Sequence, residues 1–390
     1  MKLKSRPADF QVEELTEFRC DDGPFAVYLL TKESLGTPEA VTAIERRWKL
    51  SRRQISYGGL KDKHAVTRQW VTIHRGPRRN LEQTHLSLVY QGQASRPFTP
   101  HEIVANRFRI VLRNLPAEQA ERIVSLSDVV ARDGVPNYFD DQRFGSLGQS
   151  GEFLAAPWCR GDYERTLWLA IAEPNPHDRP EDREEKEILR TRWGDWPACK
   201  AALPRSSRRS LVTFLCDHPT DFRRAVALLR QDLRSLYLAA FQSFLWNRIV
   251  AETLVEHVAA ERRFDVALDI ARLPFFRELS DDERTLLHAR SLPLPSARLH
   301  FEPNDPRAAL YERVVREAAG LELRELRVKY PRDTFFSKGD RPAVIAPRDY
   351  RAFRGPDELE SQRQAVTLEF VLPRGSYATI VIKRLTGTLR

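Results

Sequence analysis

One run of the chain places a single carboxylate among several cations beside a pair of glycines. The run is GGLKDKHAVTRQW, residues 58–70, in which Asp62 lies between Lys61 and Lys63 and Arg68 follows. Two glycines permit a tight turn and the close approach of a ligand. Neighbouring cations favour the ionised form of a carboxylate and attract phosphate groups. This combination is typical of a catalytic carboxylate that acts on the sugar or base of a nucleotide.

The elements that must position this run are read from hydrophobic periodicity. Asn106 to Leu112 alternates, with Phe108, Ile110 and Leu112 on one side, which predicts a strand. Helix-compatible spacing of apolar residues predicts helices after each of two prolines. The expected strands are 25–30, 70–74, 86–90 and 106–112, and the expected helices are 38–50 and 116–134.

The composition changes after about residue 158. Residues 173–190 are rich in proline and charge and read as a linker into a helix. Helical spacing then predicts a helical zone from 221 to about 263 and a helix over 305–320. Near the C-terminus we expect strands at 366–370 and 377–382, joined by a turn. Strand-rich ends around a helical middle favour an insertion, although three consecutive domains would give the same pattern.

Bulk properties narrow the class of protein. The chain has 390 residues, a net charge of +9 and a pI near 9.5, which favours a nucleic-acid partner, although an arginine-rich solvated surface would look the same. We find no apolar run long enough for a membrane span and no signal peptide, so a cytoplasmic location is expected. The 4 cysteines form no C-x-x-C pair, and no phosphate-binding glycine loop occurs. We therefore expect neither a metal nor a cofactor.

Five separated blocks, in order, resemble the motifs of the TruD family of pseudouridine synthases. Residues 58–70 match its A/G-G-x-K-D-K/R-x-A-x-T-x-Q signature at every fixed position. The other four blocks are 3–14, 105–110, 134–145 and 372–379. One departure is Ala105, where the family usually has glycine, and the segments 160–220 and 255–300 match least well.

The resemblance implies an α+β fold in which a catalytic domain, built on a mixed and mainly antiparallel sheet, is interrupted by a largely helical domain. We place the catalytic domain at 1–158 and 335–390 and the inserted domain at 159–334. The implied activity is isomerisation of a uridine in tRNA to pseudouridine, most often uridine 13 of the D arm. The reaction gains and loses no atoms and needs no cofactor. A monomer without an obligate protein partner is expected.

The resemblance also implies residue roles. Asp62 corresponds to the catalytic aspartate, and Lys4 to a basic residue that lies beside it and holds it ionised and oriented. Phe108 corresponds to a phenylalanine at the target uracil, although strand periodicity alone would make it a core residue. Asn106 would bond either the base or the catalytic loop, or fix a turn. The target base must be extruded from the RNA stack into this site.

Four cations are candidates for contact with RNA. Lys61, Lys63 and Arg68 surround Asp62 in the signature, and Arg143 lies in the fourth block, where it would either bind phosphate or brace the active-site loop. His64 beside Asp62 also suggests a metal ligand, but one histidine and one aspartate do not make a metal site.

Two rival functions compete with this reading. The first is a non-catalytic RNA-binding or RNA-chaperone protein on the same scaffold, which an intact signature around Asp62 disfavours. The second is a metal-dependent phosphodiesterase, which needs clustered histidines and carboxylates, whereas the 9 histidines here are scattered.

Overall fold

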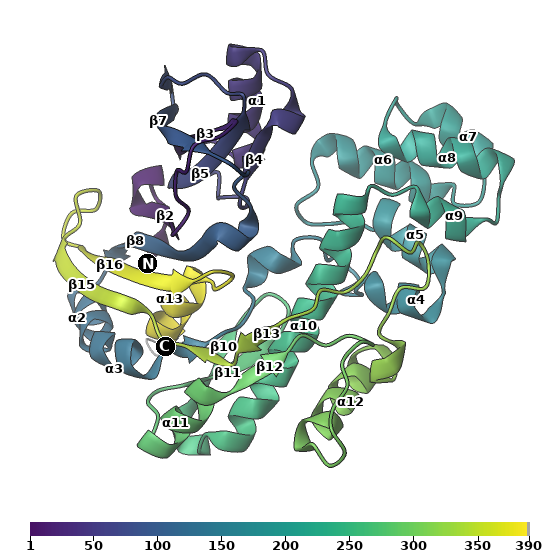
Figure 1. Ribbon diagram of the computed structural model, residues 1–390. Helices are drawn as coiled ribbons and strands as arrows, with labels where there is room; N and C mark the ends of the chain where they lie inside the picture. Colours follow the sequence, from purple (N-terminus) through teal and green to yellow (C-terminus); the bar gives the residue numbers. More distant parts are fainter. Residues whose placement is uncertain (388–390) are drawn as a thin grey trace. The chain divides into compact units, whose positions relative to one another are not determined.

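A computed structural model describes residues 1–387 of the chain (Figure 1). By its internal contacts the chain divides into two compact units, unit 1 (Met1–Val135 and Ile345–Arg390) and unit 2 (Pro136–Val344). The chain crosses between the units within two short strands, β9 (Val135–Pro136) and β14 (Val344–Ile345). The predicted inserted domain, 159–334, lies inside unit 2.

Unit 1 is built on one ten-stranded sheet in the order β15-β16-β8-β2-β5-β3-β7-β6, with β1 added beside β8 and β4 beside β5. Only β2 and β5 run parallel among these pairs, so the sheet is mixed and mainly antiparallel, as expected. The strands are β1 (Lys2–Leu3), β2 (Phe10–Thr16), β3 (Phe25–Glu33), β4 (Ile55–Tyr57), β5 (Val66–His74), β6 (Leu81–Gln83), β7 (Leu86–Ala94), β8 (Ile103–Leu115), β15 (Arg348–Pro356) and β16 (Gln364–Pro373).

Helix α1 (Thr37–Trp48) covers one end of this sheet. Its buried residues Val41 and Ile44 pack with Tyr28 and Leu30 of β3 and with Val71 of β5 in one apolar core. The helix begins with a proline in its first turn and ends at Lys49, which is left-handed with φ +52°. The core fixes β3, a central strand with neighbours on both sides.

The C-terminal segment corrects one prediction. Residues 377–382 were expected to form a strand, but the structure has a helix there, α13 (Ala378–Gly387). Its β-branched residues suit a strand by propensity, yet the helix buries Ile380, Val381 and Leu385. Burial of an apolar helix face outweighs such propensities, which are weak.

The helix expected over 116–134 is two helices, α2 (Ala117–Ser125) and α3 (Ser127–Asp133), broken at Leu126. Ser125 and Ser127 flank the break, and their hydroxyls donate to main-chain carbonyls one turn back, at 2.9 and 3.4 Å. Serines that bond the local main chain compete with helix continuation.

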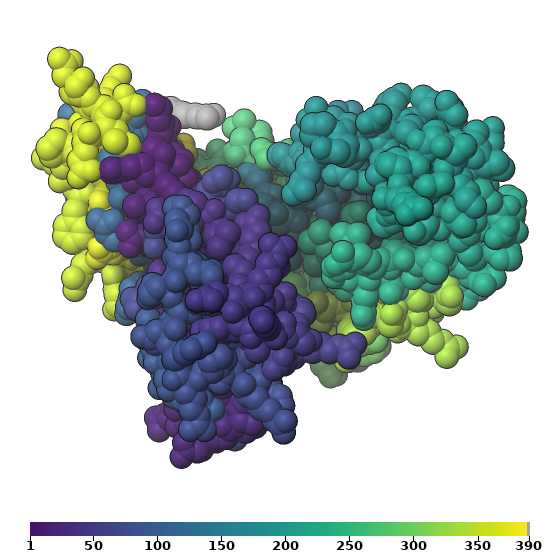
Figure 2. All heavy atoms as spheres, turned by 90° about the horizontal axis from the view of Figure 1, so that it is seen from above, coloured from purple at the N-terminus to yellow at the C-terminus, as the bar shows by residue number. Residues whose placement is uncertain are grey.

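Both ends of the described chain belong to unit 1. Strand β16 pairs with β8, and β8 pairs with both β1 and β2, so the C-terminal strands join the sheet begun by the N-terminal ones. Figure 2 shows the yellow C-terminal residues packed directly against the purple N-terminal residues.

Unit 2 is mainly helical. The helical zone expected from 221 to about 263 is two helices, interrupted at 228–230, and the longer one, α10, runs for 27 residues. The helices are α4 (Ala155–Arg160), α5 (Tyr163–Ile171), α6 (Pro180–Thr191), α7 (Trp196–Ala202), α8 (Ser207–Asp217), α9 (Phe222–Ala227), α10 (Gln231–His257), α11 (Asp281–Ala289) and α12 (Pro306–Ala319). The remaining strands are β10 (Arg263–Ala267), β11 (Arg272–Phe276), β12 (Ser291–Pro293) and β13 (Asp340–Pro342), in two antiparallel pairs.

Candidate active site

The side chains of Asp62 and Lys4 meet in unit 1. Lys4 Nζ donates to Asp62 Oδ2 at 2.5 Å. The Lys4 side chain is 26% exposed and the Asp62 side chain 24%, so the pair can be reached from solvent. Asp62 lies on the loop between β4 and β5, and Lys4 directly follows β1 in a left-handed conformation with φ +58°. A charge-assisted hydrogen bond of this length orients the carboxylate.

The approach of Lys4 is fixed by its neighbours. Its ammonium lies 4.1 Å from the centre of the Phe10 ring, a cation–π contact. Between the two residues the chain makes a short 3₁₀ turn that contains Asp9. Asp9 receives three hydrogen bonds from the buried Arg113 guanidinium, which also bonds Asp357. The N-terminal segment is therefore tied to the sheet directly beside the Lys4–Asp62 pair.

A second, buried ion pair lies beneath the loop. Lys61 Nζ is 2.9 Å from Glu14 Oε1 and donates to Asn106 Oδ1 at 2.9 Å. Glu14 is fully buried, and its other oxygen accepts from the main-chain N–H of Trp70. Burial raises the pKa of the Glu14 carboxyl, and its attraction to Lys61 opposes that rise. Register explains the cluster, because Glu14 lies opposite Asn106 in the β2–β8 pairing.

Main-chain atoms of the loop are held from below by β3 and α1. Lys32, which is fully buried, donates to the carbonyl oxygens of Asp62 at 2.9 Å, Lys61 at 3.3 Å and Leu35 at 2.6 Å. The Thr37 hydroxyl oxygen accepts from the N–H of Lys61 at 3.0 Å. Side chains of β3 and α1 thus bind the loop at Lys61 and Asp62.

Two polar side chains complete this support. Thr37 Oγ1 donates to Gln69 Oε1 at 2.9 Å, and Gln69 Nε2 donates to the Gly59 carbonyl at 3.3 Å. Gly58 has its own steric reason to be glycine, because a Cβ there would come within 2.5 Å of Ile103. Gly58 therefore lets the loop pass close to β8, and Gln69 holds the loop through the Gly59 carbonyl.

Aromatic residues lie on the same face of the sheet as this cluster. Phe108 is 7% exposed and contacts Phe10, with ring centres 6.3 Å apart, and Phe370, at 5.6 Å. Because Phe108 is two residues from Asn106 on β8, alternation places both side chains on one face. Phe108 is thus a core residue, as strand periodicity predicts, and its role at the target uracil stays a prediction.

The cations of the signature separate into three environments. Lys61 is turned inward, 12% exposed, and braces Glu14 and Asn106, which are not the contacts of a phosphate ligand. Lys63 is 52% exposed and pairs with Glu39 at 2.9 Å. Arg68 lies on the opposite face of β5 from Gln69 and pairs with Glu13 at 3.3 Å.

Arg143 belongs to unit 2. It lies in a short 3₁₀ turn, Asp141–Phe144, with its guanidinium 5.1 Å from the centre of the Phe139 ring. Its Nε is buried without a hydrogen-bond partner. The cation–π contact joins Arg143 to Phe139 of the same motif block.

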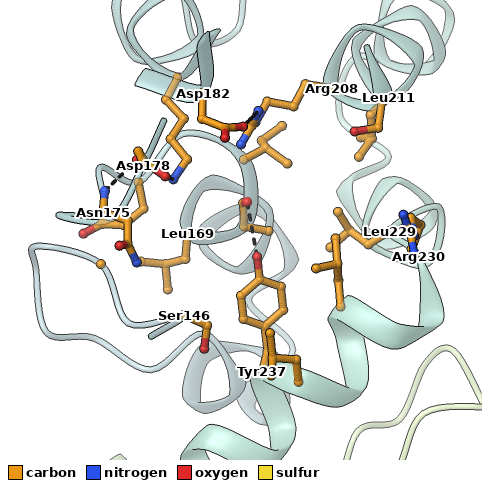
Figure 3. Close-up of a pocket in the computed structure, with 18 of the residues that line it drawn as sticks. Ser146, Leu169, Asn175, Asp178, Asp182, Arg208, Leu211, Leu229, Arg230 and Tyr237 are labelled. Carbon is orange, nitrogen blue, oxygen red and sulfur yellow. Dashed lines mark hydrogen bonds and ion pairs between the residues drawn. The ribbon is translucent and has the colours of Figure 1, made fainter. Parts of the chain in front are cut away.

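Unit 2 also has a cavity of about 440 Å³, lined by leucines, Tyr237 and several charged side chains (Figure 3). Two ion pairs lie in this lining, Lys186 with Asp178 at 2.7 Å and Arg208 with Asp182 at 2.8 Å. Tyr237 donates to the Ala170 carbonyl at 3.5 Å. Asp182 is 40% exposed and lies on helix α6, whereas Asp62 lies on the loop between β4 and β5 that holds the signature.

Comparison with known proteins decides the family. The model of the family described as tRNA pseudouridine synthase D (TruD) matches residues 1–385. The chain belongs to the TruD family.

Similar proteins span the full chain. A probable tRNA pseudouridine synthase D 1 of Methanococcus maripaludis is 28% identical over 409 residues, covering 100% of both chains. A tRNA pseudouridine synthase D of Aquifex aeolicus is 26% identical over 393 residues, covering 99% of this chain and 98% of the other. A crystal structure of the putative TruD of Methanosarcina mazei matches the fold with a TM-score of 0.72, 24% identity, and coverage of 99% and 93%.

The structure brings together four of the residues that the TruD resemblance singled out. Lys4 contacts Asp62, and Lys61 contacts Asn106, which lies on the same face as Phe108. Lys32 links the two contacts through the main-chain carbonyls of Lys61 and Asp62. Sequence reasoning missed Lys32. The signal was available, because strand alternation puts residue 32 on the buried side with Tyr28 and Leu30, where a lysine is unusual.

The described residues, 1–387, lack two features. No group of three or more histidine, cysteine, aspartate or glutamate side chains there could hold a metal ion. In the same residues no helix combines the length and the apolar character needed to cross a membrane.

Proposed function

We propose that this TruD family member isomerises a uridine of tRNA to pseudouridine, with Asp62 as the catalytic carboxylate. The observation that carries the proposal is the Lys4–Asp62 contact of 2.5 Å, accessible to solvent, on the loop that holds the family signature. The reaction breaks the bond between N1 and C1′, rotates the base and forms a bond between C5 and C1′. The C5 proton is lost and N1 gains a proton, so no atom is gained or lost overall.

Asp62 has two chemical routes. It adds to the nucleotide as a nucleophile, or it removes the C2′ proton of the sugar to give a glycal. Both routes require the ionised carboxylate at the nucleotide, and Lys4 maintains that form. Asn106 and Phe108 belong to the pocket for the extruded base, where a flat apolar ring suits a pyrimidine.

Among the four cations expected to meet RNA, Lys63 is the best placed, because it is exposed and adjacent to Asp62 in the chain. Lys61 and Arg143 serve as braces, and Arg68 lies on the other face of its strand. The target that we propose is uridine 13 of the D arm, which the family resemblance suggests.

A carbodiimide-based pseudouridine map tests the proposal. Unmodified tRNA transcripts are incubated with the wild-type protein and with Asp62→Asn, in EDTA. One new stop beside uridine 13, with wild type alone, supports the enzyme, its residue and its target. A stop at another uridine refutes only the target. If tight tRNA binding occurs without any stop, the protein is either the non-catalytic RNA-binding alternative or an enzyme for a different RNA substrate.

A further inference from the structure

We propose that Lys32 is a positioning residue, whose ammonium group fixes the main chain of the loop that carries Asp62. The inference rests on the proposed function, because the positioned group is the carboxylate of Asp62. Lys32 itself does not reach the substrate. It acts through the loop, by holding the peptide groups on either side of the Asp62 α-carbon.

The first support is the match between donors and acceptors. An ammonium group has three N–H donors, and Lys32 directs them at three carbonyl oxygens, those of Leu35, Lys61 and Asp62, at 2.6, 3.3 and 2.9 Å. Two of these carbonyls belong to the loop. With these carbonyls directed toward Lys32, the Asp62 side chain reaches Lys4.

The second support is the rigidity of the base from which Lys32 extends. It is carried by β3, which is paired over its length with β5 on one side and with β7 on the other. The same face of β3 contributes Ala26, Tyr28 and Leu30 to the apolar core under α1. A catalytic group must be held to within about 0.5 Å, and supports on packed strands achieve this better than supports on loops.

The third support is that burying the charged ammonium group of Lys32 is energetically unfavourable. Lys32 is fully buried, and its three hydrogen bonds all go to neutral carbonyls rather than to a carboxylate. Burial of an ammonium group without a carboxylate partner is unfavourable. If packing were the only requirement, an apolar or aromatic side chain such as Leu30 or Tyr28 on the same face would suffice at this position. A role in holding the loop explains why a cation is present.

The charge of Lys32 responds to pH in a range that experiments can reach. The pKa of Lys32 is lowered to about 8, because burial and repulsion from Lys61 together outweigh the attraction to Asp62 and Glu39. Below pH 8 the ammonium is protonated and makes all three bonds. Above pH 8 it loses one donor and its charge, so the loop is held less firmly and turnover falls.

Three variants test the role. Lys32→Met keeps the length and loses the charge, Lys32→Arg keeps the charge at every pH, and Lys49→Met is the control at an exposed lysine of the same unit. We expect Lys32→Met to lower kcat about 100-fold, the effect of a misplaced catalytic group, with the tRNA dissociation constant within about threefold of wild type. Lys49→Met leaves both unchanged. A kcat for folded Lys32→Met within twofold of wild type refutes the proposal.

A pH series separates positioning from general stability. The ratio of the Lys32→Arg kcat to the wild-type kcat cancels the ionisation of substrate and of other groups. We expect this ratio to rise about tenfold between pH 7 and pH 9, because arginine remains charged while Lys32 loses its proton. A ratio that is flat over this range overturns the proposal.

Hydrogen exchange of the wild-type protein provides a test without catalysis or variants. After correction for intrinsic rates, protection of the amides of residues 59–65 is expected to fall about tenfold from pH 7 to pH 9, while that of α12 stays constant. Unchanged protection in the loop contradicts the role of Lys32, whatever the reaction. If instead wild-type protein forms no pseudouridine but the loop amides respond as expected, the proposed function fails and the positioning role stands.

Discussion

Two lysine–aspartate pairs, one in each unit, differ in what surrounds them. In unit 1, Lys4 meets Asp62 at 2.5 Å with about a quarter of each side chain exposed. In unit 2, Lys186 meets Asp178 at 2.7 Å, and each side chain is 11% exposed. Lys186 bonds both oxygens of Asp178, and one of those oxygens also accepts from the Asn175 N–H. The second pair closes a turn, whereas the first joins residues 58 positions apart.

The difference teaches how a carboxylate is kept available for chemistry. Asp178 is bonded by groups of its own neighbourhood, so its charge stabilises the local fold. The loop of Asp62 is held instead through its main chain, by Lys32 and Thr37, and the carboxylate meets a lysine that is itself accessible. The buried charge of Lys32 therefore positions the loop of Asp62 and does not pair with the Asp62 carboxylate.

The largest expected effect is on turnover, when the aspartate of each lysine–aspartate pair is replaced by asparagine. We expect Asp62→Asn to lower single-turnover pseudouridine formation by about 1,000-fold, because a positioned acid–base group contributes about this much. Asp178→Asn leaves turnover unchanged and lowers the free energy of unfolding by about 2 kcal/mol, since it weakens a buried pair. Single-turnover assays and urea denaturation measure the two quantities. Equal losses of turnover in both variants contradict the contrast.

The sequence predicted the first pair well. Asp62 and Lys4 lie in two motif blocks that the resemblance joins, and the expected mixed sheet and strands 70–74 and 106–112 are present within β5 and β8. Residues in a family motif can be recognised from the sequence alone, because the match depends on residue type and spacing and not on the surroundings in the fold.

Other features needed three-dimensional information. Lys32 is an exception, because strand alternation was enough to find it. It was missed since the expected strand stopped at residue 30, whereas β3 continues to Glu33. Lys61 was expected to meet RNA, but the pairing of β2 with β8 puts Glu14 and Asn106 within its reach. The helix α13 was missed because burial decides between helix and strand for a short apolar run.

A smaller effect is expected at the lysine of each pair. Lys4→Met should lower kcat on the order of 10- to 100-fold, because the carboxylate loses its orienting partner, while tRNA affinity changes little. Lys186→Met should lower the unfolding free energy by about 2 kcal/mol and leave kcat unchanged. Steady-state kinetics with thermal denaturation checks both. An unchanged kcat for Lys4→Met removes Lys4 from the site.

Aromatic residues extend the contrast to packing. Phe108 in unit 1 and Phe275 in unit 2 are both buried strand residues. Truncation of either to alanine should cost about 3 kcal/mol of unfolding free energy. At a temperature where both variants are folded, Phe108→Ala should also lower kcat about tenfold, because the target base is held less accurately against Asp62, whereas Phe275→Ala should not. Equal kcat values would assign Phe108 to packing alone.

The smallest effect is expected at Lys63, the exposed cation beside Asp62. Lys63→Ala should weaken tRNA binding a few-fold and reduce the slope of log affinity against log salt by about 0.7 to 0.9, the contribution of one phosphate contact. Glu39→Gln is the matched variant, because it removes the carboxylate that pairs with Lys63 at 2.9 Å. It should leave the salt slope intact and strengthen binding slightly. Filter binding at several salt concentrations measures both, and an unaltered slope for Lys63→Ala means that the phosphate backbone passes elsewhere.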